Sequence, residues 1–225
     1  MRRIVVLGMA LGLLLSAVAA PAAAKTTTLD GPNAIWLSDP ERDAGDNGIE
    51  QNDSITGASG TATLNGNGAT ITVKTTGLEP GHTYTMWVAY FNDRTTCVGE
   101  CNSPDLFGGA GGGVLYGDGK VVGGSGTATF SSRLNNGAGA NAAGGPPPPF
   151  AGAVYQAGEN NELHVVIRSH GPKIAGQVAA QTHTFGGGCS VNVGPAPPGT
   201  QGDFPTPLNA GECGDVQLFI FGQNG

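Results

Sequence analysis

Residues 78–91 read Leu-Glu-Pro-Gly-His-Thr-Tyr-Thr-Met-Trp-Val-Ala-Tyr-Phe, and this stretch decides the fold class. After the Pro-Gly pair, large apolar or aromatic side chains occupy every second position, namely Tyr84, Met86, Val88 and Tyr90. A period of two places these side chains on one face of an extended strand, and Pro-Gly is typical of a turn. The stretch therefore predicts a turn followed by a half-buried β-strand.

The same alternation recurs along the chain, most clearly in residues 66–76, where Ala69, Ile71 and Val73 alternate with polar residues. Further strands are expected at residues 34–37, 59–64, 114–116, 120–122, 128–130, 153–155, 163–167, 178–185 and 216–220. No segment after the N-terminal region has apolar residues at a helical period over a helical length. Many short strands separated by Gly, Asn and Pro predict an all-β fold, an antiparallel β-sandwich with long Gly/Pro-rich loops.

The turn before the strand carries a more specific pattern. Leu78, Pro80 and Gly81 are followed by Tyr84, and this arrangement resembles the tyrosine corner of immunoglobulin-like and fibronectin type III sandwiches. The resemblance implies that the Tyr84 hydroxyl bonds to upstream backbone where the chain passes between strands. An ordinary Pro-Gly hairpin turn is the alternative. Either way the motif implies architecture and no activity.

The same stretch also resembles copper/zinc superoxide dismutase and the related secreted domains of chordin. In that family a Gly-Leu-x-Pro-Gly turn leads into a His-x-His strand whose imidazoles bind copper. Here Met86 and Val88 stand at that spacing. The resemblance therefore supports a superoxide-dismutase-like sandwich but argues against dismutase chemistry.

The N-terminus carries the features of an export signal. Residues 1–24 comprise a short basic start, an apolar run and the Ala22-Ala23-Ala24 ending that signal peptidase recognises. The run is too short to span a bilayer comfortably, and we expect no membrane span in the mature chain. Residues 167–172 and 183–189 also resemble segments of secreted bacterial proteins without an assigned activity. We expect a secreted or periplasmic protein.

Composition limits the partners and the domain count. Without Arg2 and Arg3, eight basic residues face 17 acidic ones, so the formal charge falls from −7 to −9. Such a chain lacks the basic surface that nucleic acid or an anionic membrane requires. The mature residues 25–225 are expected to form one β-sandwich domain, with loop insertions at about 135–151 and 194–211.

Four cysteines in an exported chain predict two disulfides. Because short loops close most easily, we expect Cys97 to pair with Cys101 and Cys189 with Cys213. Three connectivities are open to four cysteines. A zinc-thiolate site is the alternative, although Cys189 and Cys213 do not form a second close pair.

Histidines and acidic residues offer weak metal candidates. His170 and His183 flank a short segment and would meet if it formed a hairpin, and with His164 they are the candidates for Cu or Zn. Acidic residues between Asp39 and Asp53 could supply oxygen ligands for Ca²⁺, but the EF-hand spacing is not met. Structural histidines and a solvated loop are the alternatives, so no cofactor is expected.

The usual catalytic signatures do not occur in the sequence. The chain has no Gly-x-Ser-x-Gly elbow and no phosphate-binding glycine loop. We therefore expect a non-catalytic exported protein that binds a protein, a glycan or a cell-surface component, with loops such as 93–113 and 135–151 as contact surfaces. The alternative is a small extracytoplasmic metalloprotein or hydrolase that uses His170 and His183.

Overall fold

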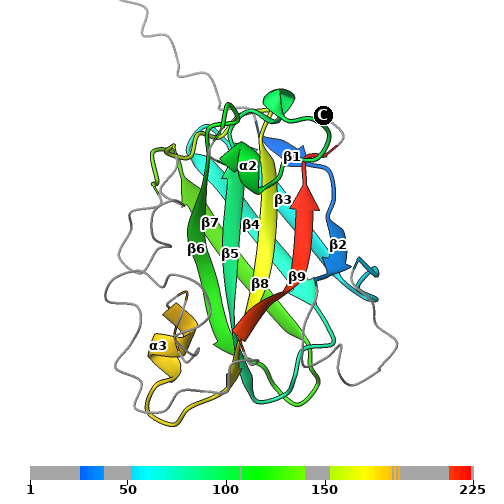
Figure 1. Cartoon of the computed structure of the whole chain (residues 1–225), viewed down its shortest axis with the longest axis vertical. Coiled ribbons are helices and arrows are strands. Elements are labelled where there is room, and N and C mark those ends of the chain that lie inside the picture. The colour runs from blue at the N-terminus through cyan, green and yellow to red at the C-terminus, as the bar shows by residue number, and fades with distance from the viewer. Residues whose placement is uncertain are drawn as a thin grey trace, which may run out of the picture.

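The computed structural model describes residues 26–37, 52–106, 108–139, 153–183, 185, 187 and 213–223. These residues form two antiparallel sheets packed face to face (Figure 1). One sheet has four strands in the order β1-β3-β4-β7, and the other has five in the order β2-β9-β8-β5-β6. The predicted all-β antiparallel sandwich is confirmed.

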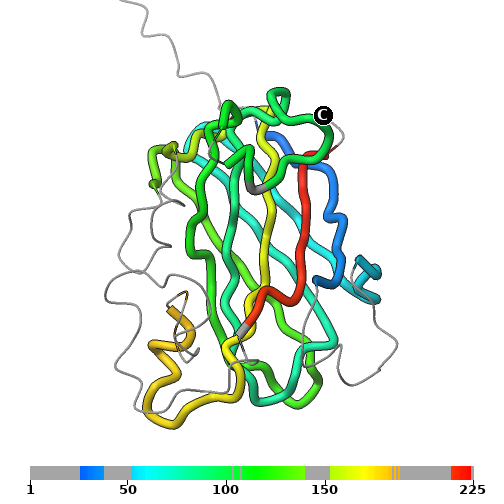
Figure 2. The backbone as a smooth tube through the Cα atoms, viewed as in Figure 1, coloured from blue at the N-terminus to red at the C-terminus, as the bar shows by residue number. Residues whose placement is uncertain are grey.

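The four-stranded sheet contains β1 (Thr27–Leu29), β3 (Ser59–Asn65), β4 (Gly68–Thr75) and β7 (Ala128–Asn135). The five-stranded sheet contains β2 (Asn33–Trp36), β5 (His82–Phe91), β6 (Gly112–Val121), β8 (Glu162–Pro172) and β9 (Cys213–Phe221). The described part of the chain also contains three short helical segments, η1 (Arg94–Thr96), α2 (Ser103–Leu106) and α3 (Val178–His183). Strands distant in sequence are neighbours in space, and β8 runs between β5 and β9 (Figure 2). None of the helices in the described ranges is long and apolar enough to cross a bilayer.

The main core fills the space between the two sheets. It contains the alternating side chains that the sequence singled out, all of them nearly inaccessible to solvent: Ala69, Ile71, Val73, Tyr84, Met86, Val88, Tyr90, Leu163, Val165 and Ile167. Full burial of such side chains contributes about 1.5–3 kcal/mol each before entropy costs. Met86 and Val88 therefore pack the core at the positions where the dismutase resemblance would require copper ligands.

The turn before β5 has the hydrogen bond that a tyrosine corner requires. The Tyr84 hydroxyl accepts the backbone N–H of Glu79 at 2.9 Å, and the Tyr84 side chain is buried. The His82 N–H closes the turn onto the Glu79 carbonyl, with Gly81 at φ +81°, a conformation that glycine adopts without strain. Buried Leu78 anchors the upstream side, since its N–H donates to the Gly126 carbonyl.

Tyr84→Phe removes this hydroxyl and leaves the ring in place. We expect the free energy of unfolding to fall by about 1–2 kcal/mol, because the Glu79 N–H loses its acceptor at a part-buried site. Urea denaturation followed by circular dichroism measures the change. An unchanged midpoint with an unchanged slope would show that the hydroxyl does not stabilise the turn.

Three of the expectations about strands differ from the structure. Residues 153–155 are described but form no strand. The strands expected at 114–116 and 120–122 form one strand, β6, with Gly117 as an extra residue where Met86 and Trp87 shift register. Residues 178–183 form helix α3 rather than the expected strand. Its Ala-rich start favours a helix, and the buried Gln181 side chain holds it by donating to the carbonyl of Pro172 at 3.0 Å.

Candidate functional site

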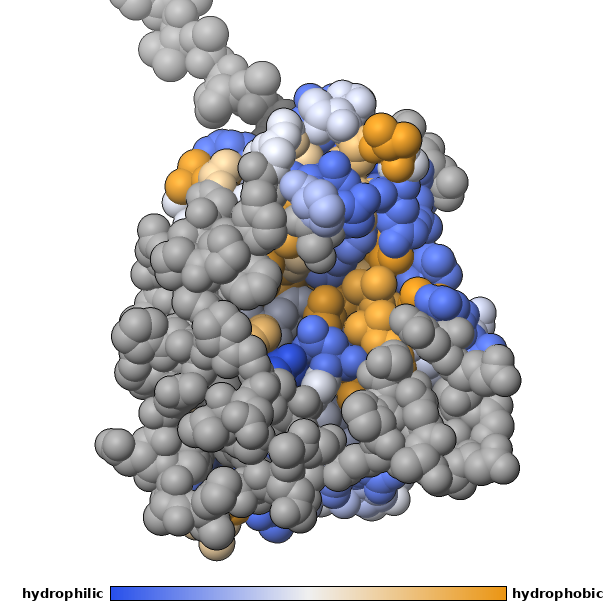
Figure 3. Space-filling model, viewed as in Figure 1, coloured by the Kyte–Doolittle hydropathy of each residue, from blue (hydrophilic) through white to orange (hydrophobic). Residues whose placement is uncertain are grey.

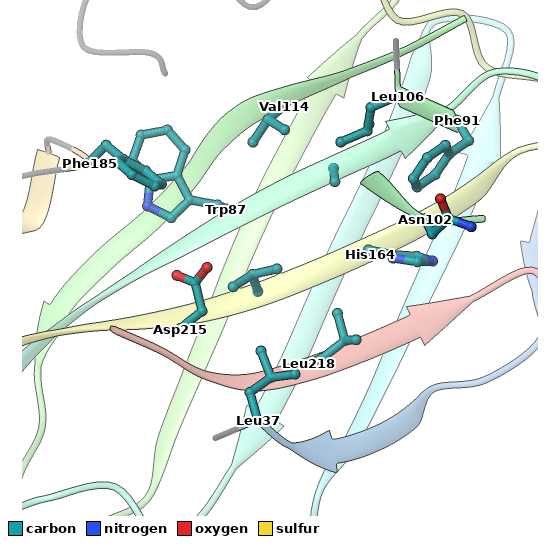
Figure 4. A pocket seen from close by; sticks show the side chains of 12 residues that line it. Leu37, Trp87, Phe91, Asn102, Leu106, Val114, His164, Phe185, Asp215 and Leu218 are labelled. Carbon is teal, nitrogen blue, oxygen red and sulfur yellow. The ribbon is translucent and has the colours of Figure 1, made fainter. Parts of the chain in front are cut away.

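A pocket of about 250 Å³ opens on the outer face of the five-stranded sheet, the face turned away from the main core. Half-buried apolar side chains from adjacent strands form its floor, including Ala89, Val166 and Leu218. Figure 4 shows the aromatic rings of Trp87 and Phe185 on one side of it and Leu106 and Phe91 on the other. Orange apolar and blue polar atoms lie side by side on this face of the molecule (Figure 3).

Two segments of the chain cover parts of this outer sheet face, and the pocket lies between them. One is the disulfide segment, residues 93–106, which contains η1 and α2 and packs Cys101 and Leu106 against Phe91 in a second, smaller core. The other cover is α3, which contacts β5 and β6. Figure 1 shows α2 over one end of the five-stranded sheet and α3 beside the other. The middle of the sheet face between these covers forms the floor.

A disulfide joins Cys97 to Cys101, with their Cα atoms 5.2 Å apart. This pair agrees with the prediction. Cys189 and the side chain of Cys213 lie outside the described residues, so their pairing stays a prediction. The export signal at residues 1–24 and most of the acidic segment between Asp39 and Asp53 also lie outside them. The same holds for the insertion at 194–211 and for most of the insertion at 135–151.

A buried carboxylate joins the disulfide segment to the sheet. Glu162 at the start of β8 is fully buried, and one of its oxygens lies 3.2 Å from Nε of Arg94. Its other oxygen accepts the Cys101 N–H at 2.9 Å and lies 2.7 Å from Nε2 of His164. Burial alone would raise the pKa of Glu162. The His164 and Cys101 hydrogen bonds and the charges of His164 and Arg94 outweigh burial and hold that pKa below its ordinary value.

His164 lines the pocket, and these contacts determine which hydrogen-bonding atom its ring can offer to a ligand. Because the ionised Glu162 can only accept, Nε2 of His164 carries the proton that it donates. Among the described residues, Nδ1 of His164 has no hydrogen-bond partner, so in the neutral ring it is an acceptor. The ring packs edge-on against Phe91, with centroids 5.0 Å apart, which fixes its orientation.

A second ion pair lies at the other end of the pocket. Arg168 is almost fully buried and donates to Asp215 at 2.7 Å and to the Phe185 carbonyl at 3.0 Å. Its guanidinium also lies 4.1 Å from the centroid of the Phe185 ring. Trp87 meets Phe185 edge-on at 5.3 Å. Arg168 therefore fixes the aromatic wall and the Asp215 carboxylate together.

His170, one of the two main metal candidates, is a buried structural residue. Its Nδ1 lies 2.7 Å from the Gly187 carbonyl, which can only accept, so Nδ1 carries the proton. Nε2 then accepts the Thr85 hydroxyl at 2.7 Å, and Thr85 in turn accepts the Trp87 indole N–H at 2.8 Å. Burial, with a smaller effect of the Arg168 charge, lowers the pKa of His170 to about 3. The ring is therefore neutral, and this network holds Trp87 in the pocket wall.

His183, the other candidate, is exposed at the end of α3 rather than on a strand. Its Nδ1 lies 2.7 Å from the Ala179 carbonyl, and its ring stacks on Tyr116 with centroids 5.7 Å apart. Within the described ranges no three His, Cys, Asp or Glu side chains gather as a metal site would need. The expected His170–His183 hairpin is wrong, because a helix replaces the second strand.

The pocket itself was not anticipated from the sequence, although a signal for it was present. In β5 the positions opposite the core-facing residues include Trp87, Ala89 and Phe91, which are also apolar. A strand that is apolar on both faces is covered on both faces. The sequence did not show what covers the second face, because the walls come from segments far away along the chain.

No protein family, curated protein or solved structure matches this chain in comparisons with known proteins. Its function is therefore inferred from the chemistry of the site.

Proposed function

We propose that this protein is an exported, non-catalytic binding protein that takes a small, largely apolar ligand into the pocket between the disulfide segment and α3. The observation that carries the proposal is the pocket itself. It has an apolar floor and aromatic walls, with a few polar groups at its edges. This is the usual composition of small-molecule sites. The N-terminal sequence pattern supports action outside the cytoplasm.

The rigidity of the walls supports binding. The disulfide and the Glu162 ion pair fix one wall, and Arg168 and the His170 network fix the other. A preformed site loses little entropy when a ligand enters. The sequence predicts binding of a protein, a glycan or a cell-surface component, whereas a pocket of this size favours a small molecule or a single side chain of a partner.

The finer fold class is also a proposal. The corner at Tyr84 and the two antiparallel sheets support placing the sandwich with immunoglobulin-like or superoxide-dismutase-like folds. The metalloprotein or hydrolase alternative is not favoured, because both ring nitrogens of His170 are already engaged.

Ala89→Leu tests the site by filling the pocket floor. The probe is N-phenyl-1-naphthylamine, a neutral dye whose fluorescence rises in apolar surroundings. We expect saturable binding to the mature protein and at least a tenfold weaker affinity in Ala89→Leu, since the new side chain occupies the volume of the ligand. Fluorescence titration measures both.

Thr70→Leu is the matched control, since it adds a leucine to an exposed position of the four-stranded sheet. Its affinity for the dye should equal that of the unmodified protein. Equal binding by Ala89→Leu, or no saturable binding by the unmodified protein, would overturn the proposed site.

A further inference from the structure

The polar atoms that reach this pocket are mainly hydrogen-bond acceptors. In its neutral form His164 offers Nδ1 as an acceptor at the end near the disulfide segment, where Asn102 adds an amide that can accept or donate. Asp215 lies at the other end, with 44% of its side chain exposed. One Asp215 oxygen binds Arg168, and among the described residues the other has no partner. Figure 4 shows Asp215 and His164 apart along the strands that form the floor.

The neighbouring cations are held away from a ligand. Arg94 faces the buried Glu162. Arg168 has only 5% of its side chain exposed and is bound by Asp215, the Phe185 carbonyl and the Phe185 ring. Neither arginine lines the pocket, and the described lining residues include no Lys or Arg. Among the described lining residues, a ligand therefore meets one exposed carboxylate and neither a Lys nor an Arg side chain.

The strand register sets the distance between the two ends. Arg168 is opposite Asp215, and His164 is opposite Ile220, so the ends lie four residues apart along β8. At about 3.3 Å per residue this is roughly 13 Å of strand. Between them lie Val166 and Leu218 on the floor, which offer only apolar contact. One polar end and an apolar body of the size of one aromatic ring fit this spacing.

From this charge complementarity we propose that the ligand is a small amine whose apolar, ring-sized body lies on the floor and whose ammonium group binds Asp215. The inference rests on the proposed function and specifies its substrate class. An ammonium group donates to the open Asp215 oxygen and is attracted by its charge. A carboxylate in the same place meets the like charge of Asp215, while Arg168 is buried and already bound by Asp215 and the Phe185 carbonyl. The pocket should therefore select amines over acids of the same shape.

Three compounds with the same ring and nearly the same length test the selectivity: 2-phenylethylamine, 2-phenylethanol and phenylacetate. We expect the amine to bind at least tenfold more tightly than the acid at pH 7 and low salt, with the alcohol between them. Competition against the naphthylamine dye, or NMR titration of the mature protein, gives the affinities. Phenylacetate binding as tightly as the amine would overturn the inference.

Asp215→Asn removes the charge and leaves a side chain of the same size. The ratio of amine to acid affinity should fall to about one or below, because Arg168 then loses its counter-charge. Glu79→Gln, which removes one negative charge at an exposed position of the corner, is the matched control and should keep the ratio.

The outcomes separate the two proposals. Failure of the dye to bind overturns the proposed function, whereas dye binding without amine selectivity overturns only the ligand class. If Asp215→Asn does not fold, the ligand series with the unmodified protein still decides the question. Raising the salt concentration should then weaken binding of the amine and leave the alcohol unaffected.

Discussion

Arg94→Met should lower the free energy of unfolding by about 3 kcal/mol at pH 7. The substitution keeps much of the apolar stem but leaves the fully buried Glu162 carboxylate without its permanent cation. Removing one partner of a buried ion pair typically costs about 3–5 kcal/mol. We take the lower figure because Glu162 keeps His164 and the Cys101 N–H. Chemical denaturation measures the loss.

Arg133→Met provides the matched control for this prediction. It makes the same replacement at an exposed position of β7, where the guanidinium contacts the Asn135 side chain. We expect a change within about 0.5 kcal/mol. A loss at Arg133 as large as at Arg94 would show that the effect belongs to arginine replacement in general and would contradict our interpretation.

The pH dependence distinguishes the charge effect from lost packing. Glu162 has a lowered pKa in the folded protein, so its ionised form contributes stability above the ordinary pKa of 4.5. That contribution is lost as the pH falls through the folded pKa. The difference between the unmodified protein and Arg94→Met should therefore shrink below pH 4.5. A difference that stays constant would assign the loss to packing alone.

Adding Glu162→Gln to Arg94→Met should recover part of the stability, because the buried charge is then absent.

The core could be predicted because strand periodicity is local. Tyr84, Met86 and Val88 alternate with polar or outward residues within one segment, and burial follows from that pattern alone. The Cys97–Cys101 disulfide could also be predicted from the sequence, because a separation of four residues leaves little choice of partner. Both inferences need only neighbours in the sequence.

The site could not be predicted, because its parts meet only through the topology. Glu162 and Arg94 are 68 residues apart, and Arg168 and Asp215 are 47 apart. Their pairing depends on β8 lying between β5 and β9, which no local pattern specifies. His170 illustrates the error that follows. Its position near a strand end suggested a metal ligand, but Thr85 and Gly187, which come from other segments, form hydrogen bonds with both ring nitrogens.

The buried neutral His170 should make the protein lose stability in mild acid. Above the ordinary histidine pKa of 6.5 the ring is neutral in both folded and unfolded chains and has no effect on the pH dependence. Between about pH 6.5 and 3 the His170 ring binds a proton in the unfolded chain but not in the folded chain, because burial lowers its folded pKa to about 3. The free energy of unfolding should therefore fall by up to about 1.4 kcal/mol per pH unit through this group.

The interval between pH 6.5 and 4.5 tests this most cleanly, because the Glu162 contribution is lost only below it. His170→Gln gives a side chain that can donate to Gly187 and accept from Thr85 but does not titrate. We expect its stability to change less steeply over the interval, by up to about 2–3 kcal/mol in total. Comparing slopes rather than absolute stabilities removes the packing cost of the substitution and the effects of the other titrating groups.

Direct NMR titration of the His170 ring supplies a readout that needs no variant. Its carbon-bound protons should show no titration step in the folded protein down to about pH 4. Protonation there would reverse the hydrogen bond, because Nε2 would donate to the Thr85 oxygen and the Thr85 hydroxyl hydrogen would have to turn away, beside the site that accepts the Trp87 indole N–H. Acid unfolding should therefore begin with changed Trp87 fluorescence and lost dye binding, and a His170 titration step near pH 6.5 in the folded protein would contradict this account.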